Sequence, residues 1–309
     1  MATTPPLASD ALTGNALIAA PFSAGHGKTS VDVPAHACDC HIHVYDSRYP
    51  AVPGARLTPS DASVADYRRL QCRTGTERAV FVTPSTYGTD NRPMLAGLSA
   101  FGAQGRGVAV VDPAITQADL EAMHLAGVRG IRINLSLGVG SHADQIEPLA
   151  HRMADLGWHI QLLAPADALV GMRDMLYRLP VAVVFDHFGR INPSMQGRHP
   201  AHALITALLK EGRAWLKLSG SYIVTEQGPP GYDDVASLAH SYLQAAPERI
   251  VWGSDWPHAS ATAGHQALPD DAQQMYLLSQ WLEGPQMLKR VLVDNPADLY
   301  GFPSTDSTP

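Results

Sequence analysis

The sequence has few of the features that mark secreted, membrane-spanning or nucleic-acid-binding proteins. Its 309 residues include three cysteines, Cys38, Cys40 and Cys72, which cannot all pair with one another. We therefore expect reduced thiols and a cytoplasmic location. No run approaches the ~18 apolar residues of a membrane span. The first twenty residues contain no lysine or arginine, so we do not expect them to form a secretory signal.

Basic runs and glycine-rich phosphate loops are also missing. The formal net charge of -7 argues against a nucleic-acid partner. No Gly-x-Gly-x-x-Gly turn follows an expected strand, which disfavours an open dinucleotide-binding sheet. The segment 23–30 contains Gly-Lys-Thr, but Phe22 stands where a P-loop needs its first glycine.

Short apolar runs alternate with helical stretches from residue 37 onward. Eight such strand-and-helix units predict a single (β/α)₈ TIM-type barrel over residues 37–302, with a doubly wound open sheet as the second choice. Residues 1–36 are expected to form a coil extension and residues 303–309 a flexible tail. The expected strands cover residues 37–44, 78–83, 107–111, 130–134, 159–163, 181–185, 214–218 and 249–252. The expected helices cover residues 61–71, 91–101, 117–126, 144–156, 165–179, 200–211, 232–245, 270–282 and 286–294.

The first expected strand ends in the sequence Asp-Cys-His-Ile-His, with histidines at positions 41 and 43. Alternate side chains of a strand share a face, so Asp39, His41 and His43 should point one way and Cys40 and Ile42 the other. Two imidazoles on one face can hold a metal or donate to a substrate oxygen. Alternatively, they are polar residues bonded to backbone or water.

Chemistry in this fold sits at the carboxyl ends of the strands. His187 follows the sixth expected strand and Asp255 the eighth, so both should converge with His41 and His43. Three nitrogens and one carboxylate suit Zn²⁺. Asp186 alternates with His187 and is expected to face away from the site as a structural residue.

Further polar side chains are expected at the same strand ends. Arg132 and Asn134 share a face of the fourth strand, and Ser85 follows the second. Tyr222 and His258 follow the seventh and eighth strands. These five residues are the expected substrate contacts.

These motifs together resemble the amidohydrolase superfamily, in particular its branch of enzymes that open pyrone-dicarboxylate and muconolactone rings. The resemblance runs from about residue 37 to 302. It implies a barrel that acts on a lactone ester. Asp255 would then be the general base, while His41, His43 and His187 would polarise the carbonyl, directly or through one Zn²⁺. The motifs that carry the resemblance are Asp39-Cys-His-Ile-His43, Gly127-Val-Arg-Gly-Ile-Arg-Ile-Asn134, Phe185-Asp-His-Phe-Gly-Arg190, Trp252-Gly-Ser-Asp-Trp-Pro-His258 and Asn295-Pro-Ala-Asp-Leu-Tyr300.

The chain departs from this branch at positions that bind substrate carboxylates. Arg132 and Ser85 match the branch, but Gly138 and Ile223 stand at two arginine positions and Leu163 at a tyrosine position. Arg132 is then the only matched anion-binding group. We therefore expect a small lactone with one anionic group, of the muconolactone type, in a pocket shaped by the segments 137–142 and 228–231.

Several alternatives stay open from the sequence alone. The resemblance includes an enzyme that works without metal, and the strand-5 histidine of many metal-bearing relatives is absent, so a metal-free reaction is the alternative to zinc. The stretches Tyr49–Gly54 and Asp66–Leu70 resemble sugar-acid lactonases and lactone isomerases. A barrel that only binds a ligand is a third interpretation. The expected partner is an anionic lactone, with no nucleic acid and no membrane, and the expected assembly is a monomer or homodimer.

Overall fold

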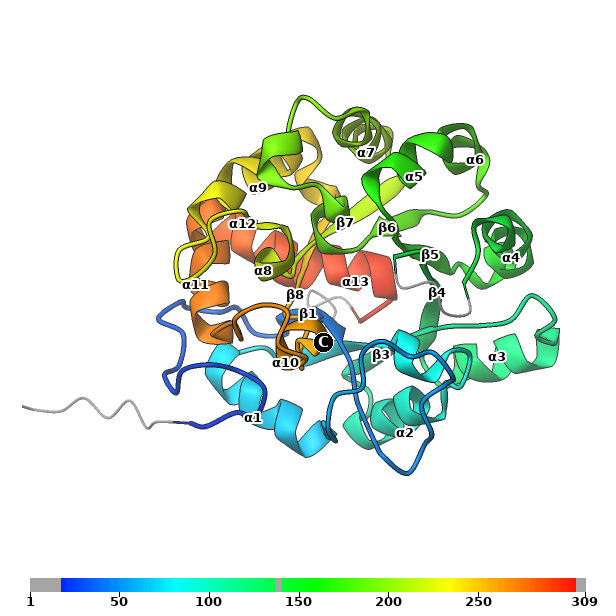
Figure 1. Ribbon diagram of the computed structural model, residues 1–309, viewed down its shortest axis with the longest axis horizontal. Coiled ribbons are helices and arrows are strands. Elements are labelled where there is room, and N and C mark those ends of the chain that lie inside the picture. Colours follow the sequence, from blue (N-terminus) through cyan, green and yellow to red (C-terminus); the bar gives the residue numbers. More distant parts are fainter. Residues whose placement is uncertain (1–17, 137–140, 304–309) are drawn as a thin grey trace, which may run out of the picture.

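The computed structural model describes residues 18–136 and 141–303. Eight parallel strands follow one another around a near-closed barrel in sequence order, with helices outside, as Figure 1 shows. The predicted (β/α)₈ fold is confirmed. The strands are β1 (Cys38–Ile42), β2 (Arg78–Val82), β3 (Gly105–Ala109), β4 (Val128–Asn134), β5 (His159–Leu163), β6 (Val183–Phe185), β7 (Ala214–Ser219) and β8 (Ile250–Gly253).

The barrel closes where β1 meets the chain that follows β8. The amide of Asp255 donates to the carbonyl of His41 at 2.9 Å, and the amide of His43 donates to the carbonyl of Trp256 at 2.8 Å. These bonds fix the histidine-bearing strand directly against the turn that carries Asp255.

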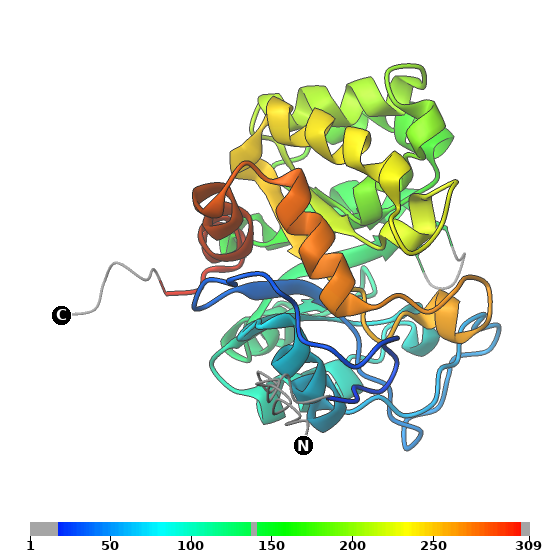
Figure 2. The same cartoon turned by 90° about the vertical axis from the view of Figure 1, so that its left-hand side faces the viewer.

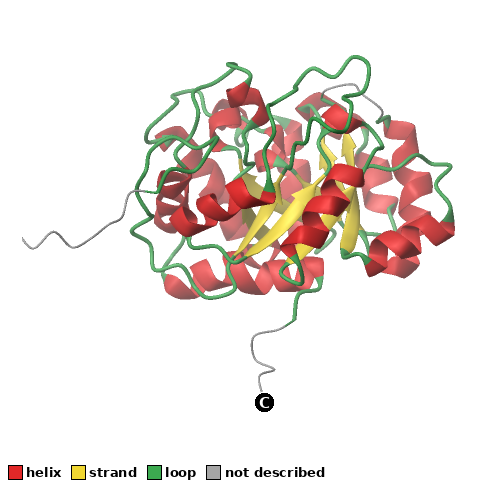
Figure 3. Ribbon diagram, turned by 90° about the horizontal axis from the view of Figure 1, so that it is seen from below, coloured by secondary structure: helices red, strands yellow, loops and turns green. Residues whose placement is uncertain are grey.

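The helices surround the strands on the outside of the barrel, as Figure 3 shows from below. Ser63 begins α1 with a capping box to Asp66, and Gly75, at φ 78°, ends it. The helices are α1 (Val64–Thr74), α2 (Arg92–Phe101), α3 (Gln117–Leu125), α4 (Ile146–Met153), α5 (Ala166–Gly171), α6 (Arg173–Arg178), α7 (Pro200–Lys210), α8 (Ser221–Val224), α9 (Asp233–Ala245), α10 (Ala259–Thr262), α11 (Asp271–Trp281), α12 (Pro285–Lys289) and α13 (Asn295–Tyr300).

Two expected helices differ from the structure. The stretch 165–179 is two helices, because the backbone leaves the helical region at Met172. The stretch 286–294 contains α12 and a π-helical turn, and the chain continues as α13, which was not predicted. The four-residue helices α8 and α10 were also missed, since so short a segment has no periodic pattern.

The strict alternation predicted for β1 is wrong. Its register against β2 shifts between Asp39 and Ile42. Cys40 packs with the valines inside the barrel, and His41 also points inward, toward Lys217. Asp39 points outward instead, where its carboxylate accepts hydrogen bonds from Ser254 and from Tyr67 of α1.

Residues 18–36 run along the outside of the barrel beside α1 and α11 (Figure 2). The buried guanidinium of Arg73 donates to the carbonyls of Ala24 and Gly27 and pairs with Asp270 at 2.5 Å. The indole of Trp256 donates to the carbonyl of Pro21 at 2.8 Å. This segment therefore supports the turn next to Asp255.

Parts of three predicted stretches fall outside the described residues: residues 1–17 of the coil extension, residues 304–309 of the tail, and residues 137–140 with Gly138. No helix in the described part of the chain is long and apolar enough to cross a membrane.

Candidate active site

Three imidazoles converge on one carboxylate at the carboxyl end of the barrel. Oδ1 of Asp255 lies 3.6 Å from Nε2 of His41, 3.5 Å from Nε2 of His43 and 3.8 Å from Nε2 of His187. All four residues are buried. The structure therefore brings together the four residues predicted as the catalytic group.

Each imidazole is held from behind through its Nδ1 atom. Nδ1 of His43 lies 2.7 Å from the carbonyl of Val82, and Nδ1 of His187 lies 2.9 Å from Oγ of Ser219. Nδ1 of His41 lies 3.2 Å from both Nζ of Lys217 and Oδ1 of Asp186. Partners of this kind orient a ring and decide which nitrogen carries hydrogen.

The turns that present these side chains use uncommon backbone conformations. His187 has φ 47° and Asp255 has φ 70°, in the left-handed region. Such non-glycine residues cost about 1–3 kcal/mol each and gather at functional sites. Gly220 makes room for His187, because a Cβ on Gly220 would lie 3.1 Å from Nδ1 of His187.

Three of the four predicted metal ligands form a compact donor group. One donor atom each from His41, His187 and Asp255 lies within 4.8 Å of the others. Nε2 of His41 is buried and has no hydrogen-bond partner in the described part of the chain. These donors fit a metal such as zinc. His43 stands beside Asp255 but outside this group.

The charges of the site follow from burial and proximity. Burial favours a protonated Asp255, but the nearby imidazoles of His187, His43 and His41 outweigh it and hold the pKa of this carboxyl well below its usual range. Burial lowers the pKa of His41 and of His187. Burial thus opposes a charge on His41 and His187, whereas the Asp255 carboxylate stays ionised near neutral pH.

A network of polar side chains lies beneath the histidines, inside the barrel. Nε2 of Gln161 donates to Oδ2 of Asp186 at 3.0 Å, and Nζ of Lys217 donates to Oε1 of Gln161 at 2.6 Å. The prediction that Asp186 faces away from the site is wrong. The positive φ of His187 breaks the alternation, so both residues serve the same end of the barrel.

The site opens into a cavity of about 310 Å³. Arg132, Asn134 and Ser85 line it, as predicted. Arg56 and Arg190 line it too, so Arg132 is not its only cation, contrary to the prediction. Neither of these two arginines makes an ion pair within the described ranges. Neither arginine was predicted as a substrate contact, although Arg190 ends the motif Phe185-Asp-His-Phe-Gly-Arg190 that carries the family resemblance.

Tyr222 and His258 lie behind Asp255, outside the cavity lining. The hydroxyl of Tyr222 donates to Oδ2 of Asp255 at 2.5 Å. Nε2 of His258 pairs with Oδ2 of Asp271 at 3.0 Å, and both side chains are fully buried. Tyr222 and His258 therefore lie where they support the turn at Asp255, and neither lines the substrate cavity.

Residues 38–302 match the model of the amidohydrolase family. The chain belongs to this family. The expectation of an enzyme rather than a non-catalytic barrel is confirmed. The branch named from the motifs is also confirmed by curated relatives.

Those relatives match almost the whole chain. A 2-pyrone-4,6-dicarboxylate hydrolase of Comamonas testosteroni is 32% identical, over 90% of this chain and 94% of its own. A 4-sulfomuconolactone hydrolase of Rhizobium radiobacter is 32% identical, over 88% of this chain and 92% of its own. A D-galactarolactone isomerase of Agrobacterium fabrum is 30% identical, over 89% of this chain and 94% of its own. A solved apo structure from Agrobacterium tumefaciens superposes with a TM-score of 0.81 at 30% identity, covering 88% of this chain and 98% of that one.

Proposed function

We propose that this amidohydrolase opens the ester ring of an anionic lactone of the muconolactone type, such as 4-sulfomuconolactone. The observation that carries this proposal is the convergence of three imidazole Nε2 atoms on the ionised Asp255 carboxylate, in a cavity that also holds three arginines. Two of the relatives named above are hydrolases of rings that bear acidic groups.

In this reaction Asp255 takes a proton from the attacking water. Its low pKa makes it a weak base while all three imidazoles face it. A substrate carbonyl that draws the imidazoles toward its own oxygen removes part of that stabilisation and raises the basicity of Asp255. Tyr222 holds the other carboxylate oxygen, so the free lone pairs of Oδ1 stay directed into the site.

We propose one zinc ion for this site. His41, His187 and Asp255 would hold it, and it would supply Lewis acidity toward the lactone carbonyl. In the metal-free alternative, imidazole N–H groups donate to the carbonyl oxygen directly. Asp255 remains the base in both cases.

The three arginines favour a substrate with more than one anionic group. Arg132 lies deepest and also stands 3.5 Å from Asp186, whereas Arg56 comes from the loop after β1 and Arg190 from the turn after β6. Guanidinium groups bind carboxylate and sulfonate oxygens through paired N–H donors. This revises the expectation of a single anion, while Leu163 and Ile223 keep one wall of the cavity apolar.

Lactone isomerisation is the second candidate, because a galactarolactone isomerase shares the same overall similarity. A carboxylate that takes a proton from water can equally take one from a carbon or hydroxyl group. Reaction in ¹⁸O-labelled water separates the two. Hydrolysis places one labelled oxygen in the ring-opened acid, whereas isomerisation leaves the product unlabelled.

A lactone panel tests the proposal. Neutral, singly charged and doubly charged lactones would be followed for ring opening, with the Asp255→Asn variant as the blank. We expect turnover of the charged lactones by the natural protein alone. If no lactone is opened, or if the blank opens them equally well, the proposed function is wrong.

A further inference from the structure

A lysine lies in the interior of the barrel, directly beneath the active site. Lys217 of β7 is fully buried. Its Nζ lies 2.6 Å from Oε1 of Gln161, 3.2 Å from Nδ1 of His41 and 3.5 Å from Oδ1 of Asp186. Burying an ammonium group costs free energy unless its hydrogens find acceptors. One of the three acceptors around it is a nitrogen of the proposed catalytic group.

His41 Nδ1 stands between two groups with opposite requirements. The Lys217 ammonium can only donate a hydrogen bond, and the ionised Asp186 carboxylate can only accept one. Both lie 3.2 Å from the same nitrogen. A bare Nδ1 accepts from Lys217, whereas a protonated Nδ1 donates to Asp186. The ring can satisfy only one of these neighbours at a time.

The geometry of the site favours Lys217 as the partner. The contact between Lys217 and His41 has the geometry of a hydrogen bond, whereas Oδ1 of Asp186 has no hydrogen-bond partner among residues 18–136 and 141–303. Gln161 keeps this arrangement in place, because its amide donates to Asp186 and its carbonyl accepts from Lys217.

His43 has the opposite tautomer. The carbonyl of Val82 can only accept, so a neutral His43 carries its hydrogen on Nδ1 and has a lone pair on Nε2. For His41, a bare Nδ1 places the hydrogen on Nε2. That atom is buried, unpartnered in the described structure, and 3.6 Å from Oδ1 of Asp255.

We propose that Lys217 is a positioning residue that, in the protein without metal, fixes His41 as the Nε2–H tautomer, so that this ring donates toward the reacting carbonyl. Zinc binding at Nε2 would require the ring hydrogen to move to Nδ1, where Asp186 accepts it. Asp186 stabilises the other tautomer, whose bare Nε2 can bind a metal. The polar network beneath the site thus decides whether His41 acts as a hydrogen-bond donor or as a metal ligand. The inference rests on the proposed function only for the identity of the reacting carbonyl.

Nitrogen NMR of ¹⁵N-histidine-labelled protein, freed of metal and without substrate, tests the tautomer. The His41 signals are assigned by their loss in His41→Gln. We expect Nε2–H in the natural protein and Nδ1–H in Lys217→Met, where Asp186 is the remaining partner. An unchanged tautomer in Lys217→Met would overturn the proposal. So would an Nδ1–H signal in the natural protein, whether or not Lys217→Met folds.

Zinc affinity, measured by competition with a chelator, is the second readout. Lys217→Met leaves Nε2 of His41 ready to bind, so we expect its zinc affinity to rise about tenfold, within the range by which ligand-orienting partners change metal affinity. Lys210→Met at the exposed end of α7 is the matched control and should bind zinc like the natural protein. Equal affinities of Lys217→Met and this control would contradict the proposal. Neither readout requires lactone turnover, so it can fail independently of the proposed function.

Discussion

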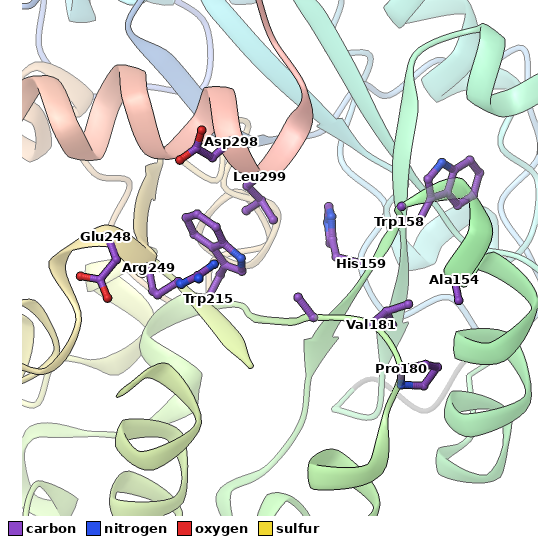
Figure 4. A pocket seen from close by; sticks show the side chains of 12 residues that line it. Ala154, Trp158, His159, Pro180, Val181, Trp215, Glu248, Arg249, Asp298 and Leu299 are labelled. Carbon is purple, nitrogen blue, oxygen red and sulfur yellow. The ribbon is translucent and has the colours of Figure 1, made fainter. Parts of the chain in front are cut away.

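The two ends of the barrel each have a cavity, and they differ in what their polar groups contact. At the amino ends of the strands, a cavity of about 410 Å³ is lined by Trp158, His159, Trp215, Arg249 and Leu299, among others, as Figure 4 shows. The guanidinium of Arg249 lies over the ring of Trp215. Neither ring nitrogen of His159 has a partner in the described structure. At the carboxyl ends, His41, His43 and His187 each have a partner at Nδ1.

This difference shows that convergence and support, rather than cavity size, mark a site. His159 packs edge-on against the ring of Tyr300, with centroids 5.3 Å apart, and sits where a Cβ on Gly130 would clash with its ring. It is one more buried side chain of a core layer. His41, His43 and His187 have one nitrogen fixed from behind and the other directed at a shared carboxylate. The amino end of the barrel therefore provides matched control residues for the carboxyl end.

Replacing Asp255 with Asn should have the largest effect. The amide keeps the shape but cannot accept a proton from water, and loss of a general base costs ~10²–10⁴ in rate. The matched control is Asp298→Asn, which changes an exposed carboxylate at the amino-end cavity and should leave kcat unaltered. Steady-state kinetics on an opened lactone measures both. Near-natural kcat in Asp255→Asn would show that another group is the base.

Removing the metal, or replacing both histidines of β1, should have the second-largest effect on activity. We expect about one zinc per chain by elemental analysis, because one compact donor group is present in the described structure. Prolonged chelation should abolish activity and added zinc should restore it. The double change His41→Ala and His43→Ala should lose metal and activity together, whereas His159→Ala should keep the metal. A fully active protein without metal would instead support direct donation by the imidazoles.

Changing Arg132 to Met should act on binding rather than on chemistry. Losing a hydrogen bond to a charged group costs roughly 1.5–3 kcal/mol. KM for a charged lactone should therefore rise by about one to two orders of magnitude, and KM for a neutral lactone should change little. Arg249→Met at the amino end should change neither value. Equal effects of Arg132→Met on charged and neutral lactones would make Arg132 a structural residue, consistent with its position near Asp186.

The sequence predicted the barrel and the four residues at its centre, and it failed where local geometry departs from regular alternation. His41, His43, His187 and Asp255 could be found because they follow apolar runs, which mark strand ends. The bulge in β1 could not, since it depends on the closure between His41 and Asp255. The positive φ angles after β6 and β8 leave no periodic signal, so Asp186 was assigned to the wrong side.

The arginines show a second limit of reasoning from sequence. The resemblance to the branch predicts a pocket that keeps Arg132 but lacks two further arginines, because Gly138 and Ile223 stand at their positions. Arg56, from the loop after β1, and Arg190, from the turn after β6, add positive charge to the cavity. Only the folded chain shows that these three guanidinium groups share a cavity. Likewise, the role of Lys217 depends on three distances that no spacing along the chain encodes.

His159→Phe should have the smallest effect on activity, with kcat and KM unchanged, and should change only the pH dependence of stability. Burial lowers the pKa of His159 to about 3, so the folded state resists protonation that the unfolded state accepts near pH 6.5. The unfolded state then binds more protons below pH 6.5, and stability falls as the pH falls from there toward the folded pKa.

Between pH 7 and pH 5 this one histidine should cost the natural protein about 2 kcal/mol of unfolding free energy. Phenylalanine keeps the ring contact with Tyr300 and cannot be protonated, so the variant should lose about 2 kcal/mol less over that interval. Urea denaturation at the two pH values measures the difference. An identical loss in both proteins would mean that His159 is solvated or hydrogen-bonded in solution, and the contrast between the two ends of the barrel would then be smaller than the structure indicates.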